Sequence, residues 1–255
     1  RGKQVRFLVT NDDGIYAEGL RVLVEALAEL GEVWIVAPNQ ERSGVSHGIT
    51  VNRPLRIEKY SLFPGTAEAY VMDGTPADCV KLAIESMNVE VDYVVAGINN
   101  GANLGIDVFY SGTVAAAFEG AIQQIPSIAV SLCKITPSDQ FFYQTAAQSL
   151  HKLLANAEWA AAAGLLNINV PNVPPEQIRG FKATKLGVNR YKNEFEKRLD
   201  PRGKPYYWMK GVHFQVDYTE GDDFSAVEQH FISVTPLSTD LTDYQKLQTL
   251  QSLFG

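Results

Sequence analysis

The sequence predicts an α/β protein with a mostly parallel β-sheet, and the first half of the chain supplies the reasons. Apolar residues alternate with others over residues 5–9, which is typical of a buried strand. Apolar residues at three- and four-residue spacings from 19 to 30 then describe one face of a helix. Strand and helix signals continue to alternate, and strands separated by such helices pair in parallel through crossover connections.

The remaining elements follow from the same patterns. We expect strands at 32–37, 92–98, 127–131, 165–170 and 231–234, and a hairpin formed by 49–60 and 67–72. We expect helices at 75–87, 114–122, 138–163, 225–229 and 241–253. The helix at 75–87 has the clearest start, with Thr75 as its cap, Pro76 in its first position and Asp78 three residues after the cap.

The second half of the chain adds two appendages. We expect residues 1–255 to form a single α/β catalytic domain, with a projecting β-arm at 174–221 and a C-terminal helical tail at 237–255. The arm is polar and extended in pattern, and it carries aromatic residues at Tyr191, Tyr206, Tyr207 and Trp208. Exposed aromatic side chains on such an arm more often mark a protein interface than a ligand site.

Composition excludes several classes of function. The 255 residues carry a formal net charge of −7, whereas a nucleic-acid binder normally shows a basic balance, so we expect no nucleic-acid partner. No apolar run approaches the ~18 residues of a membrane span and no basic-then-apolar leader begins the sequence, so we expect no membrane association. Cys79 and Cys133 lie far apart and are expected to be reduced thiols of a cytoplasmic protein.

Two adjacent carboxylates stand where the first strand ends. Asp12 and Asp13 follow the apolar run and precede Gly14 and the first helix, so they lie at the carboxyl end of a strand, where open α/β sheets bind ligands. Neighbouring like charges repel each other, and a hard cation between them is the natural compensation. The competing interpretation is a tight turn in which an aspartate caps the helix.

Two further strand ends carry oxygen-bearing side chains. The loops at 37–44 and 97–105 contain Ser43, Asn99 and Asn103, and parallel strands would bring these loops to the same edge of the sheet. Carboxylates, hydroxyls and amides are ligands for Mg²⁺ or Mn²⁺, and the scarcity of histidine and cysteine disfavours zinc. Each residue taken alone could instead satisfy the loop backbone.

A helix start completes the predicted site. Ser111, Gly112 and Thr113 precede the helix at 114–122, where unpaired amides and the helix dipole can hold a phosphate. A simple N-cap by Ser111 or Thr113 is the alternative, and the two roles can coexist. A metal site with two carboxylates beside an anion-binding helix start indicates phosphoester hydrolysis by in-line attack of a metal-activated water.

Five segments, in this order and at this spacing, resemble the SurE family of survival-protein 5′/3′-nucleotidases: 10–15 (TNDDGI), 41–44 (ERSG), 73–80 (DGTPADCV), 97–105 (GINNGANLG) and 110–114 (YSGTV). The resemblance is dense from residue 5 to about residue 132 and resumes more loosely at 233–237. One departure is Asn39-Gln40, where the family commonly has Asp-Arg, and this change could alter substrate preference.

The resemblance implies a function and a set of site residues. It implies a Rossmann-like three-layer fold, a homodimer or homotetramer built through C-terminal elements, and hydrolysis of nucleoside monophosphates with one divalent cation. It also suggests cleavage of short polyphosphate, as by an exopolyphosphatase. By position, Asp12 and Asp13 match catalytic residues, the metal ligands are Asp12, Asp13, Ser43 and Asn99, and the phosphate-binding residues are Asn103, Ser111, Gly112 and Thr113.

Other functions compete with this interpretation. A non-catalytic nucleotide-binding sensor would show Gly-x-Gly-x-x-Gly after the first strand or a Gly-Lys-Ser/Thr loop, and neither is present. A phosphotransferase acting through an aspartyl-phosphate on Asp12 usually spaces its two aspartates by one residue. His47 is either a solvated or hydrogen-bonded loop residue or a proton donor to the leaving group, and the pair Asp222-Asp223 is expected to cap a helix.

Overall fold

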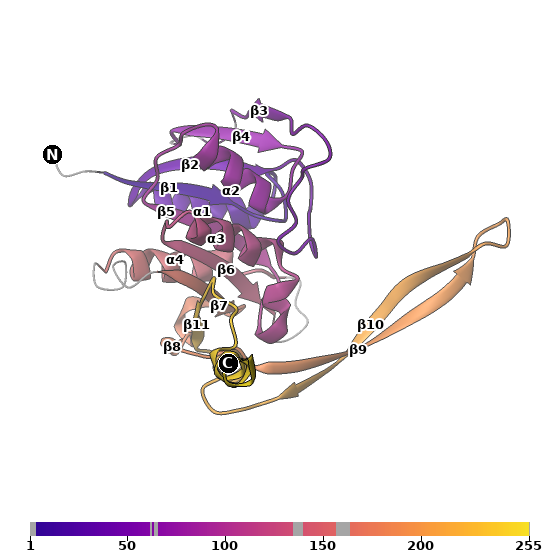
Figure 1. The fold of residues 1–255 in the computed structure, drawn as a ribbon. Helices are drawn as coiled ribbons and strands as arrows, with labels where there is room; N and C mark the ends of the chain where they lie inside the picture. Colours follow the sequence, from indigo (N-terminus) through magenta and orange to yellow (C-terminus); the bar gives the residue numbers. More distant parts are fainter. Residues whose placement is uncertain (1–3, 62, 64–65, 135–139, 157–163, 255) are drawn as a thin grey trace.

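The computed structural model describes residues 4–61, 63, 66–134, 140–156 and 164–254. Its main feature is a nine-stranded sheet in the order β3-β4-β2-β1-β5-β6-β7-β11-β8 (Figure 1). The strands are β1 (Val5–Thr10), β2 (Gly31–Pro38), β3 (Ile57–Lys59), β4 (Glu68–Met72), β5 (Tyr93–Asn100), β6 (Ser127–Cys133), β7 (Leu165–Pro171), β8 (Phe181–Ala183) and β11 (Ile232–Leu237).

The centre of this sheet is parallel, as the alternating strand and helix signals predict. The contiguous strands β4, β2, β1, β5, β6 and β7 all pair in parallel. β3 pairs antiparallel with β4, which forms the expected hairpin, and β11 runs antiparallel to β7. Because the central strands share one direction, the loops that follow β1, β2 and β5 leave the sheet at the same edge.

The helices are α1 (Glu18–Ala28), α2 (Pro76–Glu85), α3 (Gly112–Ile122), α4 (Tyr143–Leu154), α6 (Asp223–Glu228) and α7 (Tyr244–Phe254), with short 3₁₀ turns at η1 (Gly105–Phe109) and η2 (Pro175–Gln177). These helices cover both faces of the sheet. Alternate residues of β1 face opposite layers: Phe7 and Val9 pack with α1 and α4, whereas Leu8 packs with α2. The period-two pattern of a buried strand therefore produces a three-layer α/β fold (Figure 1).

Two predicted helices need comment. At α2 the side chain of Thr75 accepts from the backbone of Asp78 and the carboxylate of Asp78 accepts from Thr75, which is the capping box that the sequence predicts. The long helix expected at 138–163 is wrong at its start, because α4 begins at Tyr143. The side chain of Asn172 binds the N–H of Phe142 and the carbonyl of Gln140, which holds the chain outside a helix there. α4 ends at Leu154, and residues 138–139 and 157–163 of the expected helix lie outside the described residues.

The projecting β-arm covers fewer residues than the expected range of 174–221. β9 (Val188–Leu199) and β10 (Pro205–Asp217) pair only with each other among the described strands, and they project from the body (Figure 1). β8, by contrast, pairs with β11 in the main sheet, so the projecting part is limited to 188–217. No residue of α7 is buried. In the part of the chain that the structure describes, no helix has the length and apolar character to cross a membrane.

Candidate active site

A cavity of about 610 Å³ opens at the edge of the sheet where β1 and β5 end and α3 begins. It is lined by residues from four separate stretches of sequence, among them Asp12, Ser43, Asn99, Asn103, Tyr110 and Ser111. The parallel sheet explains this convergence, because each of the three strand-end loops and the start of α3 reaches the same edge.

The turn after β1 fixes the two carboxylates. The side chain of Asn11 closes the turn by accepting from the N–H of Gly14 (3.1 Å) and donating to its carbonyl (2.9 Å). Gly14 has φ +98°, a conformation that glycine adopts without strain. Asn11 was not among the site residues predicted from the sequence, although Asn, Asp and Gly in succession are typical of a turn.

Asp12 is the most deeply buried of the predicted metal ligands, with 4% of its surface exposed. Its carboxylate accepts from the hydroxyl of Thr113 at 2.5 Å and from the N–H of Thr113 at 3.2 Å. Burial raises the pKa of Asp12 to about 6, against the opposing effect of the Thr113 hydroxyl and with a further increase from the charge of Asp13. The site thus holds a buried carboxylate next to a second carboxylate.

Asp13 lies beside the loop that follows β5. Its carboxylate accepts from the N–H of Asn100 at 3.0 Å, and this bond joins the loop after β1 to the end of β5. Burial raises the pKa of Asp13 too; the Asn100 contact opposes this and the charge of Glu41 adds to it. Both carboxylates are therefore pushed toward their neutral forms, and a bound cation would reverse that tendency.

Ser43 and Asn99 supply neutral oxygens to the cavity that Asp12 lines. The loop of Ser43 is tied to the turn by the N–H of Arg42, which donates to the carbonyl of Asp12 at 2.7 Å, and the Ser43 hydroxyl donates to Glu41 at 2.7 Å. The amide nitrogen of Asn99 donates to the carbonyl of Gly101 at 2.9 Å, so the end of the amide outside this bond is its oxygen.

This donor set fits a hard divalent cation. Asp12, Ser43 and Asn99 line one cavity, and Asp13 is bonded to the residue after Asn99, so all four predicted ligands lie in one neighbourhood. They offer oxygen only, as Mg²⁺ and Mn²⁺ prefer. Among the described residues no cluster of three or more His, Cys, Asp and Glu is found that could hold a metal.

The predicted phosphate-binding residues divide into two groups. Ser111 and Asn103 line the cavity. Ser111 also caps α3, because its hydroxyl oxygen accepts from the N–H of Val114 at 3.0 Å. Thr113 is fully buried and gives both its hydroxyl and its N–H to Asp12, and Gly112 lets Asp12 approach, since a Cβ there would lie 3.0 Å from the Asp12 Cβ. In this geometry Thr113 binds the Asp12 carboxylate and Gly112 leaves room for it.

Asp223 differs from its predicted interpretation, whereas His47 matches one of the two interpretations given for it. The Asp222 carboxylate caps α6 through the N–H of Ser225, as expected, but Asp223 turns inward and accepts from the N–H groups of Gly105 and Gly187, each at 2.8 Å. Asp223 thereby holds the start of η1 in place. His47 contacts Glu119 at 2.9 Å and is not among the residues that line the cavity.

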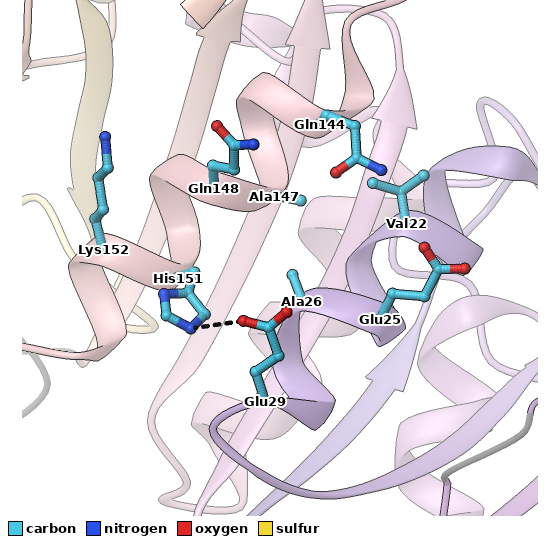
Figure 2. Close-up of a pocket in the computed structure, with 9 residues that line it drawn as sticks. All are labelled: Val22, Glu25, Ala26, Glu29, Gln144, Ala147, Gln148, His151 and Lys152. Atoms are coloured by element: carbon cyan, nitrogen blue, oxygen red, sulfur yellow. Dashed lines mark ion pairs between the residues drawn. The ribbon is translucent and has the colours of Figure 1, made fainter.

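A second hollow, of about 370 Å³, lies between α1 and α4 (Figure 2). Glutamine and glutamate side chains surround it, and His151 approaches Glu29 at 3.5 Å. None of the predicted site residues lines this hollow. It is a groove between two helices with a single ion pair, and it offers no convergent set of ligands.

Comparison with known proteins agrees with the site's chemistry. The family model described as "Survival protein SurE" matches residues 7–193. The chain is 46% identical to the 5'-nucleotidase SurE of Alkaliphilus metalliredigens over 253 residues, which cover 98% of each chain. It is 48% identical to the 5'-nucleotidase SurE of Heliobacterium modesticaldum, covering 98% of this chain and 92% of that one.

The fold agrees as well. The crystal structure of the SurE protein from Aquifex aeolicus superposes with a TM-score of 0.80 at 36% identity, covering 98% of this chain and all of that one. Sequence and fold therefore match over nearly the whole length. The chain belongs to the SurE family.

Proposed function

We propose that the chain hydrolyses nucleoside monophosphates to nucleoside and phosphate, as a metal-dependent 5′-nucleotidase. The observation that carries the proposal is the buried carboxylate of Asp12, which lies between the start of α3 and the cavity, with Asp13, Ser43 and Asn99 around it. The similarity to the curated 5'-nucleotidases supports the same reaction.

The four oxygen ligands would hold one divalent cation, and we propose Mg²⁺ or Mn²⁺. Such a cation supplies Lewis acidity, which draws charge from a phosphoryl group and lowers the pKa of a water molecule. The chain's own contribution is to orient Asp12 and to oppose part of the effect of burial on its charge. The Thr113 hydroxyl and the positive end of α3 both favour the carboxylate form, and the Asn100 contact does the same for Asp13.

The phosphate end of the substrate would lie against Ser111 and Asn103. Ser111 sits at the N-terminus of α3, where the helix dipole favours negative charge, and Asn103 faces the same cavity. These groups are fixed before substrate arrives, so they can stabilise charge that develops on the phosphoryl oxygens without reorganising. We assign no residue as the acid for the leaving group.

The cavity also has room for a nucleoside. Its volume of about 610 Å³ lies in the range of small-molecule sites, and Ile106, Tyr110 and Met209 add apolar surface to the polar floor. Tyr110 has 59% of its surface exposed, which suits an aromatic ring that packs against a base. We propose that this side of the cavity contacts the base and ribose.

The appendages suggest how the chain assembles. The exposed residues of the projecting arm include Tyr207, Trp208 and Met209, and α7 exposes Leu250 and Phe254. Such apolar surface is typical of a subunit interface, and we propose a homodimer or homotetramer built through these elements. The two free, buried cysteines fit a reducing compartment, for which we propose the cytoplasm.

The experiment measures phosphate released from 5′-AMP, 3′-AMP and tripolyphosphate with Mg²⁺, Mn²⁺ or EDTA. We expect turnover of 5′-AMP that requires the cation and that falls by about a thousandfold or more in Asp12→Ala. Glu29→Ala, in the second hollow of Figure 2, is the matched control and should keep full activity. Full turnover by Asp12→Ala or in EDTA would exclude the mechanism.

The same assay separates the competing functions. Retention of 5′-AMP without hydrolysis, with either cation present, would favour a nucleotide sensor. A covalent phosphoenzyme trapped at low pH would favour a phosphotransferase that uses Asp12 as its nucleophile.

A further inference from the structure

We infer that Asn167 and Asn169, on β7, are positioning residues that fix the phosphate end of the site through hydrogen bonds to the backbone of Asn103. The inference rests on the proposed function in one respect, namely that Asn103 lies on the phosphate side of the cavity. The two asparagines do not line the cavity themselves. Their effect on the reaction would pass through Asn103.

The position of the two asparagines is unusual for amide side chains. β7 lies between β6 and β11, and both Asn167 and Asn169 have no exposed surface. Their neighbours along the strand are Leu166, Ile168 and Val170, and the strand is otherwise apolar. A buried central strand normally carries apolar residues on both faces, so two amides on one face indicate a specific polar partner.

That partner is the main chain of Asn103. The carbonyl of Asn103 accepts from the amide nitrogen of Asn167 at 2.8 Å and from that of Asn169 at 3.1 Å. The N–H of Asn103 donates to the amide oxygen of Asn169 at 2.9 Å. Both backbone groups of one loop residue are therefore bound by side chains from a strand more than sixty positions away in sequence.

The side chain of Asn103 is held as well. Its amide nitrogen lies 2.7 Å from the hydroxyl of Ser131, on β6, and Cys133 donates from its thiol to the oxygen of Asn169 at 3.3 Å. A hydroxyl can accept from an amide nitrogen or donate to an amide oxygen, so the Ser131 contact fixes the plane of the amide with either end toward the cavity. The backbone of Asn103 and one end of its side chain are thus both held by hydrogen bonds.

The network carries a cost that apolar residues would avoid. Among the described residues, the amide oxygen of Asn167 has no hydrogen-bond partner although it is buried. An unsatisfied buried acceptor destabilises a fold, whereas a leucine at this position would pack without that penalty. Because the two amides bind the residue that faces the cavity, the positioning of Asn103 accounts for polar groups that the core does not need.

The test compares Asn169→Leu with Asn172→Leu. Leucine has nearly the shape of asparagine and removes both of its polar ends. Asn172 is the matched control, because it lies just after β7 and also binds two backbone groups, those of Phe142 and Gln140, away from the cavity. Three quantities are measured for each protein: phosphate affinity by isothermal titration with Mn²⁺ present, the Mn²⁺ concentration that gives half-maximal turnover of 5′-AMP, and the urea midpoint.

We expect Asn169→Leu to weaken phosphate binding by about tenfold or more while changing the half-saturating Mn²⁺ by less than about threefold. Asn172→Leu should lower the urea midpoint to a comparable extent and leave phosphate affinity within about twofold of wild type. Unchanged phosphate affinity in Asn169→Leu, or an equal loss in Asn172→Leu, would overturn the inference and leave the two asparagines with a structural role only.

A milder variant keeps the test decisive if Asn169→Leu fails to fold. Ser131→Ala removes only the hydroxyl that binds the Asn103 side chain, and we expect weaker phosphate binding by about threefold or more with an unchanged urea midpoint. Wild-type phosphate affinity in Ser131→Ala would then overturn the inference. Absence of 5′-AMP hydrolysis by the wild type would instead count against the proposed function, since the titration of phosphate does not depend on turnover.

Discussion

The hydroxyl of Thr113 donates to the carboxylate of Asp12 over 2.5 Å, and the N–H of the same threonine donates to it at 3.2 Å. These bonds join the first strand end to the start of α3, two points that lie 101 positions apart in sequence. They also set the chemistry of the carboxylate. Asp12 is buried and repelled by Asp13, and Thr113 provides two donors that favour its charged form.

Thr113→Val should therefore impair the metal site without breaking the fold. Valine keeps the shape of threonine but loses the hydroxyl, and a hydrogen bond to a charged group is worth about 1.5–3 kcal/mol. We expect the half-saturating concentration of Mn²⁺ at neutral pH to rise by roughly ten- to a hundredfold. Thr145→Val is the control, because the Thr145 hydroxyl is also buried and donates to the carbonyl of Val173 instead. An equal half-saturating concentration of Mn²⁺ in Thr113→Val and Thr145→Val would contradict this prediction.

Removing the charge of Asp12 should stabilise the metal-free protein. The folded-state pKa of Asp12 is raised from 3.8 to about 6, so the folded protein binds this proton more tightly than the unfolded chain does. The resulting stability is fully present below the unfolded pKa and is lost as pH rises through about 6. The shift corresponds to about 3 kcal/mol of unfolding free energy.

The measurement is urea unfolding in EDTA. Asp12→Asn should be more stable than wild type at about pH 8, and the difference should shrink toward about pH 4, where the wild-type carboxylate is protonated. Asparagine can still donate to the Thr113 oxygen, so little packing is lost. A variant less stable than wild type at the higher pH would show that the hydrogen bonds outweigh the burial and repulsion.

Gly112→Ala should reduce activity through steric displacement. A Cβ at Gly112 would lie 3.0 Å from the Cβ of Asp12, 3.2 Å from its carboxylate oxygen and 3.2 Å from Cγ of Pro76, so Asp12 and Pro76 must move apart by a few tenths of an ångström. Gly112 is the first residue of α3, where only part of the preference of a helix interior for alanine over glycine (about 1 kcal/mol) applies and the close contacts offset it, so the melting temperature should change little. We expect kcat/KM for 5′-AMP to fall by about tenfold or more. Gly164→Ala, where a Cβ meets no atom within 4 Å, should behave as wild type.

Local sequence patterns predict much of this fold because each depends on neighbours in the chain. The alternation around Phe7 places β1, and Thr75 with Asp78 predicts the cap of α2; both are confirmed. The edge of the sheet that holds the cavity follows from the parallel order of the central strands. Asp12, Ser43 and Asn99 were predicted by the same logic to lie together, and they line one cavity.

The remainder depends on contacts between distant segments, which no local pattern contains. Thr113 was predicted to bind phosphate because it stands at a helix start, but in the fold its donors face Asp12. Asn169 stands in a strand that the sequence places correctly, yet nothing nearby in the chain indicates that Asn103 is its partner. Asp223 was interpreted as part of a capping pair, and only the fold shows that it binds Gly105.

Tyr110→Ala should separate nucleoside recognition from phosphate chemistry. Tyr110 lines the cavity, is largely exposed and is not one of the predicted metal ligands. Loss of an aromatic ring that packs on a base costs about 1–3 kcal/mol, so KM for 5′-AMP should rise by roughly five- to a hundredfold. Glycerol phosphate has no base, and its kcat/KM should change by less than about twofold. An equal loss for both substrates would place Tyr110 in the phosphate site, whereas no loss for either would remove the apolar side of the cavity from substrate recognition.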